Sequence, residues 1–278
     1  MLFEESVIPL DQWVTVSVDW LVENHRDIFQ AMKWPVEQIL NWCDQGLNAI
    51  HPFIVIIFFG LIAWKFSSKR LAIFSMASMT LIGLLGLWED AMTTLAMVLS
   101  SVLFCALVGI PLGIISGRND RFEACIRPVL DAMQTTPAFV YLVPIVMLFS
   151  VGNVAGVLAT LIFAMPPIIR LTSLGIRGVH PELIEAAQAF GATHWQVLFK
   201  VQVPLAMPTI LAGLNQTIMM ALAMVVIAAL IGAGGLGAPV ILGLNTLDIG
   251  RAVTGGLAIV LMAIVLDRIT QSMAQKNK

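Results

Sequence analysis

Charged side chains are scarce in this sequence of 278 residues. Only 12% of the residues are Asp, Glu, Lys or Arg, whereas 59% are hydrophobic; soluble domains usually carry about 25% charged residues. No charge occurs between Asp131 and Arg170, or between Lys200 and Asp248. A helix crosses a bilayer with roughly 20 apolar residues, so these runs are long enough to span one. The sequence therefore predicts an all-α polytopic membrane protein.

Residues suited to metal, redox or covalent chemistry are also few. The three cysteines, Cys43, Cys105 and Cys125, are too scattered for a disulfide framework, and the four histidines show no metal-ligand spacing. The sequence contains neither a phosphate-binding G-x-x-x-x-G-K-[ST] loop nor a G-x-S-x-G nucleophile motif. The glycines of residues 232–237 match the dinucleotide fingerprint in spacing only, because a hydrophobic segment precedes them instead of a strand. We therefore expect a chain that is not an enzyme and holds no cofactor or metal of its own.

Hydrophobic runs predict about seven transmembrane helices. Their approximate bounds are 52–64, 71–88, 93–115, 133–149, 154–169, 206–231 and 252–266. Lys and Arg collect on the cytoplasmic side of membrane proteins. With the N-terminus outside, only Arg26, Lys33 and Arg251 of the 15 Lys and Arg residues lie on the outer side. We therefore predict an outer N-terminus and an inner C-terminus, with no basic patch for nucleic acid.

The N-terminal segment differs from the rest. Residues 9–50 place four tryptophans among acidic residues, and Trp13, Val16 and Trp20 share one helical face. Tryptophan favours the membrane–water boundary, because its ring is apolar and its N–H needs a partner. We predict an amphipathic extracytoplasmic helix within residues 1–50, followed by a transmembrane domain of residues 51–278; a small helical cap on the spans is the alternative. The acidic start of the chain argues against a cleaved signal peptide.

The predicted spans hold almost no ionisable groups. A carrier driven by protons or sodium needs such groups inside the membrane, where they are costly and usually functional. Asp131 and Arg251 lie near span ends, where capping or snorkelling explains them. The energy source for any transport is therefore expected on another chain.

One polar segment, residues 177–204, interrupts the apolar pattern. Pro181 suits the first turn of a helix, and Glu182 and Glu185 suit its positive N-terminal end. Gly191 is placed to end this helix.

A second helix is predicted directly after it. Thr193-x-x-Gln196 has the spacing of a capping box, and Pro204 is expected to close this helix. An ordinary connection needs only a few residues, so a segment of this length favours a docking element for a cytoplasmic partner.

The docking element resembles the EAA motif of ABC importer permeases, in which E-A-A-x-x-x-G is followed by I-x-L-P. The matching residues are Glu185, Ala186, Ala187, Gly191 and Pro204. Val201 and Val203 replace the usual Ile and Leu and keep the apolar character. A wider resemblance, to permeases for glycine betaine, proline betaine and related quaternary amines, covers "LDAMQTTPAFVYLVPIVMLFSVGNVAGVL" and "GAGGLGAPVILGLNTLDIGRAVTGGL".

The resemblance implies an assembly. In such importers two permeases, expected here as a homodimer, work with a cytoplasmic ATPase subunit that binds ATP and Mg and with a substrate-binding protein. The EAA segment forms the coupling helix that meets the ATPase. We expect a separate periplasmic binding protein, because no binding domain follows Lys278, and hence the inner membrane of a Gram-negative bacterium.

A quaternary ammonium substrate would be recognised by aromatic faces. The candidate pathway residues are Trp88, Phe139, Tyr141 and Phe149. Packing against lipid or core is the alternative role for these side chains. Three other functions stay open: a choline-preferring permease of the same family, an ABC permease for another small solute such as an amino acid, and an osmolyte channel that works without ATP.

Overall fold

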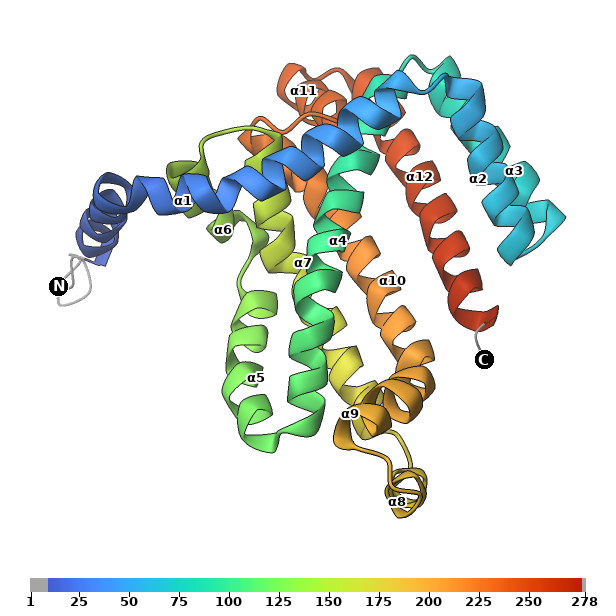
Figure 1. The fold of residues 1–278 in the computed structure, drawn as a ribbon. Helices are drawn as coiled ribbons and strands as arrows, with labels where there is room; N and C mark the ends of the chain where they lie inside the picture. Colours follow the sequence, from blue (N-terminus) through green and yellow to red (C-terminus); the bar gives the residue numbers. More distant parts are fainter. Residues whose placement is uncertain (1–9, 277–278) are drawn as a thin grey trace, which may run out of the picture.

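The computed structural model describes residues 10–276, and every regular element in that range is helical. The long helices α4 (Trp88–Arg118), α7 (Asn153–Arg177), α10 (Val203–Ala228) and α12 (Ile249–Lys276) form the body (Figure 1). Around them lie α1 (Leu10–Ala49), α2 (Pro52–Phe66), α3 (Lys69–Leu84), α5 (Asp120–Thr135), α6 (Ala138–Phe149), α8 (Pro181–Ala189), α9 (His194–Val197) and α11 (Gly237–Thr246). The all-helical membrane fold predicted from the sequence is confirmed.

Helix α1 lies across one end of the body (Figure 1). Its second half, Asp27–Ala49, meets α2 at 104°. Val36 and Leu40 are buried in the core, and the Thr93 hydroxyl on α4 donates a hydrogen bond to Asp44 (2.8 Å). Trp34 and Trp42 stay exposed. The helix therefore packs on the spans along one face and presents tryptophans on another, so it has features of both the amphipathic helix and the cap; the division of the chain at residue 50 stays a prediction.

Four helices, those starting at Trp88, Asn153, His194 and Ile249, are long and apolar enough to cross a membrane. The count among the described residues rises to six if each of two bent helix pairs is one span. One bent pair interrupts the span predicted at 133–149, because α5 and α6 meet at 98°. Pro137 stands at this break, and a proline disfavours helical geometry in the residue before it. The predicted count of seven spans and their orientation stay predictions.

Three glycines on α4 bring its backbone against α7. Gly109, Gly113 and Gly117 recur every fourth residue and therefore lie on one face of the helix. A Cβ atom on Gly113 would lie 2.5 Å from the Cβ of Thr172 and 2.7 Å from the carbonyl oxygen of Ile169. Small residues at this spacing let membrane helices approach closely, and dispersion attraction between the two closely packed backbones then stabilises the pair.

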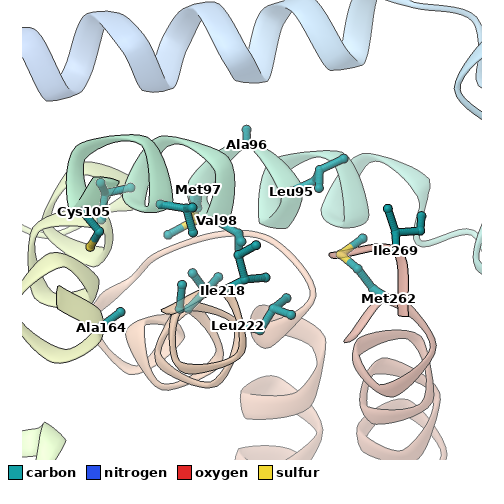
Figure 2. Close-up of a cluster of buried hydrophobic side chains, with 14 of the residues drawn as sticks. Leu95, Ala96, Met97, Val98, Cys105, Ala164, Ile218, Leu222, Met262 and Ile269 are labelled. Atoms are coloured by element: carbon teal, nitrogen blue, oxygen red, sulfur yellow. The ribbon is translucent and has the colours of Figure 1, made fainter. Parts of the chain in front are cut away.

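The apolar core lies between α4, α7, α10 and α12. Figure 2 shows buried side chains from all four helices meeting there, among them Met97, Ala164, Leu222 and Met262. Helix α10 reaches α7 through Gly213, where a Cβ atom would lie 3.0 Å from the Cβ of Leu171. The core is therefore built on close backbone contacts as well as on side-chain burial.

The glycine-rich segment that follows the sixth predicted span is partly helical. Residues Ala229–Ile231 form a 3₁₀ turn, Gly232 and Gly235 take positive φ angles of 76° and 82°, and α11 begins at Gly237. The N–H of Leu236 donates to the Thr94 hydroxyl (2.8 Å), which ties this segment to α4. Helix α11 lies at the same end of the body as α1 (Figure 1).

We expect Gly113→Ala to destabilise the protein. The added methyl group collides with α7, and overpacking of this kind typically costs about 1–3 kcal/mol. The thermal unfolding midpoint of the purified chain in detergent measures the effect. Gly256→Ala on α12 is the matched control, because a Cβ atom there meets nothing within 4 Å. Equal midpoints for the two variants would contradict the glycine contact.

Candidate functional site

Helix α8 projects from one end of the body, opposite α1 (Figure 1). None of its nine residues is buried. Isolated helices shorter than about 12 residues are marginal in water, because few hydrogen bonds offset the cost of nucleation. A short helix without buried side chains therefore gains little from its own chain and is suited to packing against another protein.

The end of α8 is closed by its own backbone. The N–H of Phe190 donates to the carbonyl of Ala186 (3.1 Å), and the N–H of Ala192 donates to that of Ala187 (3.0 Å). Gly191 has a φ of 80°, a left-handed conformation that costs glycine little. The helix end predicted at this glycine is confirmed.

The capping box predicted for the second helix is present. The Thr193 hydroxyl accepts a hydrogen bond from the N–H of Gln196 (3.4 Å), and the Gln196 side chain accepts one from the N–H of Thr193 (2.8 Å). The expectation that Pro204 closes this helix is wrong, because the chain stays helical from His194 to Ile231. A π-helical turn at Leu198–Gln202 precedes Pro204. It re-routes the backbone hydrogen bonds where the proline has no N–H to donate.

Large apolar side chains of this segment point into solvent. Phe190 is 94% exposed, and Trp195 and Phe199 are exposed and stacked on each other, with ring centroids 5.9 Å apart. Leu183 on α8 is exposed as well. Aromatic residues are enriched where proteins bind each other. We call these four residues the docking surface; the sequence pattern indicates the segment but not its aromatic anchors.

The residues matched to the EAA motif lie in or beside this surface. Glu185 and Ala186 are exposed on α8, and Ala187 is half-buried. Gly191 forms the turn, and Pro204 lies in the first turn of α10. The structure therefore brings the first four together and places Pro204 at the base of the long helix that follows.

Tyr141, a candidate pathway residue, makes hydrogen bonds across the α5–α6 bend. Its hydroxyl contacts the carbonyl oxygens of Met133 and Thr136, the latter at 3.0 Å. These carbonyls belong to the last turn of α5 and the residue after it, where no further helical N–H is available. The side chain therefore stabilises the angle between the two helices.

The other aromatic candidates are dispersed. Phe149 is buried and packs edge-on against Phe29 of α1, with centroids 5.7 Å apart. Phe139 is exposed on α6, and Trp88 begins α4, where it packs against the main core instead of ending the second predicted span. The four residues do not form one aromatic site within the chain.

The structure contains a charged cluster between α5 and α7 that the sequence pattern does not predict. Asp131 pairs with Arg170 (2.5 Å), whereas the sequence suggested a helix cap or snorkelling. Arg177 pairs with Asp120 and Glu123 (2.6 Å each). The spacing of the acidic residues along α5 was the available signal, but the partners on α7 lie about 40 or more residues away in sequence.

Long apolar helices joined by a short projecting helix are the arrangement expected of a membrane transport permease, and the comparison with known families agrees. Residues 109–278 match the family of binding-protein-dependent transport system inner membrane components. The chain belongs to this family and is therefore a multi-pass protein of the inner membrane.

Two relatives align over nearly the whole chain. The chain is 54% identical to the glycine betaine/proline betaine transport system permease protein ProW of Escherichia coli, covering 99% of this chain and 78% of that protein. It is 46% identical to the glycine betaine transport system permease protein OpuAB of Bacillus subtilis, covering 98% and 96%. A chain of the MetNI methionine ABC transporter superposes with a TM-score of 0.59 at 23% identity, covering 66% and 93%. This last likeness supports the fold alone.

We expect Tyr141→Phe to loosen the α5–α6 bend, because two carbonyls lose their hydrogen-bond partner at a cost of about 1 kcal/mol. Spin labels on α5 and α6 should give a broader distance distribution in double electron–electron resonance. Thr254→Val is the control, since among the described residues the Thr254 hydroxyl bonds only to the carbonyl of Gly250 in its own helix. Phenylalanine keeps the aromatic ring and removes only the hydroxyl. An unchanged α5–α6 distance distribution together with normal uptake would therefore show that the hydroxyl does not stabilise the bend.

Proposed function

We propose that this chain is the permease subunit of an ATP-driven importer that moves glycine betaine or a related quaternary amine into the cell. The observation that carries the proposal is α8, a helix with no buried residue that projects from the body and carries the EAA residues. The names of the two relatives support the substrate class. A permease supplies the path, so the chain itself would catalyse no reaction.

The partners follow from this role. A cytoplasmic ATPase subunit would bind the docking surface and would hold ATP and Mg. The permease would therefore need no site for either. A separate substrate-binding protein would deliver the amine at the opposite end, where α1 and α11 lie. The working unit would contain two copies of the permease, and a Gram-negative periplasm would hold the binding protein.

Motion at the docking surface would reach the transmembrane helices on both sides. Helix α7 ends at Arg177, four residues before α8 begins at Pro181. On the other side, a continuous helix runs from His194 to Ile231. Closure of the ATPase would therefore move α7 and α10 together, because Gly175 and Gly213 hold these two helices in close contact.

Uptake measurements test the importer. We expect labelled glycine betaine to accumulate in proteoliposomes only when permease, ATPase and binding protein are all present, and not with an ATPase that cannot hydrolyse ATP. Unlabelled choline as competitor distinguishes the choline-preferring alternative. Uptake by the permease alone would identify a channel and would contradict the coupling role of α8.

We also expect Phe190→Ser to weaken association with the ATPase by about tenfold or more, the scale of an interface anchor. Uptake should fall with association, while the unfolding midpoint stays unchanged because Phe190 is 94% exposed. Phe53→Ser is the matched control, since Phe53 is also exposed but lies on α2. Wild-type affinity for Phe190→Ser would remove this residue from the proposed interface.

A further inference from the structure

Helix α5 carries a polar stripe along its length. Asp120, Glu123, Arg127 and Asp131 are spaced by three or four residues and therefore share one face. The adjoining face is apolar and packs inward through Leu130, which is buried. The apolar face of such a helix packs on the protein core, and its polar face requires a polar environment.

The polar stripe meets two arginines of α7. The Arg170 guanidinium lies 2.5 Å from the Asp131 carboxylate, and the Arg177 guanidinium lies 2.6 Å from both Asp120 and Glu123. Arg177 also donates to the carbonyl of Ser116 on α4 (2.8 Å). These contacts hold α5 against α4 and α7 around a cavity.

The cavity has a volume of about 350 Å³, at the lower end of the range for small-molecule sites. Arg127 lines it and forms no ion pair with any residue of 10–276. Ser173 lines it as well; its side chain is 5% exposed, and its buried hydroxyl has no hydrogen-bond partner among those residues. A guanidinium outside the ion pairs of the cluster and a buried hydroxyl without a hydrogen-bond partner together provide donors for an anionic group.

The ion pair in this cavity lies away from the ends of both helices. Arg170 precedes the C-terminal end of α7 by seven residues, about 10 Å along the helix, and Asp131 follows the start of α5 by eleven residues, about 16 Å. Their side chains are nevertheless 42% and 54% exposed. Charged groups on membrane-crossing helices face water or protein, because contact with hydrocarbon costs several kcal/mol. The exposed side of the pair therefore faces an aqueous space or a second subunit.

The charges of the cluster balance. Three arginines, Arg127, Arg170 and Arg177, stand against three carboxylates, Asp120, Glu123 and Asp131. A net cation such as choline has no anionic group for Arg127 to bind, and a net anion would be opposed by the carboxylates. A zwitterion with separated charges matches both signs.

We propose that this cavity is a binding station for a small zwitterion in the cytoplasmic half of the translocation path. Arg127 and Ser173 would hold the carboxylate of the substrate, and the quaternary ammonium group would lie on the side of Asp131 and Glu123. The inference rests on the proposed function, since it adds a substrate site to the importer. It selects betaines, which carry a carboxylate, over choline, which has none.

Chemical protection at the cavity tests the station. Leu174 lines the cavity and is exposed, so Leu174→Cys, in a chain whose three native cysteines are replaced, reports on occupancy. Glycine betaine at millimolar concentration should slow modification by a positively charged thiosulfonate reagent at least threefold, in the full complex with inner face accessible. Choline at the same concentration should leave the rate unchanged.

Two further variants assign the effect to the proposed donors. Arg127→Gln in the Leu174→Cys background should abolish protection by glycine betaine, and Ser173→Ala should reduce it. Arg121→Gln is the matched control, because Arg121 lies on α5 outside the cavity lining and should keep protection intact. Equal protection by choline, or protection that survives Arg127→Gln, would overturn the station.

The same variant also tests whether the cavity faces a second copy of the permease instead of water. A disulfide between two copies of Leu174→Cys under oxidation, with no modification by the reagent, would show that the cavity faces a second permease and would also overturn the proposal. The experiment is independent of ATP-driven uptake. Loss of protection with intact uptake rejects the station alone, whereas absence of uptake with intact protection rejects the importer alone.

Discussion

The close approach of α4 to α7 is the contact on which the rest of the structure depends. Three glycines remove the side chains that would separate the two backbones. Lipid competes with apolar side chains for the same contacts, so a membrane helix pair is stabilised by packing at short distance more than by hydrophobicity. Once α7 is fixed, α10 can pack on its other side through Gly175 and Gly213, and α5 can pair with its arginines.

This arrangement explains why the docking segment and the charged cavity occupy one end of the molecule. Helix α7 supplies Arg170 and Arg177 to the cavity and leads directly into α8. A displacement of α8 would therefore act on the cavity through α7 without an intervening flexible domain. The hydrogen bonds from Tyr141 join α6 to the end of α5, the helix that forms one wall of the cavity.

The sequence was informative where local rules apply. The helix ends at Pro181 and Gly191 and the capping box at Thr193 follow from neighbouring residues, and all three are present in the fold. The apolar runs predict membrane-crossing helices, and four of the described helices are long and apolar enough to cross, or six if each bent pair is one span. The hydropathy pattern does not show the break between α5 and α6, because the uncharged run that begins after Asp131 continues through Pro137. A hydropathy pattern does not indicate where a helix bends. A proline does, because it disfavours helical geometry in the residue before it.

The site was harder to predict because its contacts are not local. The pairing of Asp131 with Arg170 joins two helices that a hydropathy pattern treats as separate spans. The exposure of Phe190 depends on α8 projecting from the body, which no window of sequence encodes. The four candidate aromatics were chosen by residue type alone, and the structure disperses them between two hydrophobic clusters and the surface.

A balanced charged cluster reconciles two demands on a path for zwitterions. A single buried carboxylate would bind a quaternary ammonium group too tightly for rapid release, and a fully apolar path would offer nothing in place of its hydration. Paired charges provide short-range partners for both ends of the substrate, and they leave little net field to trap it. The ion pairs also keep α5 attached to α7 when the cavity is empty, so the same residues support both the fold and the proposed passage.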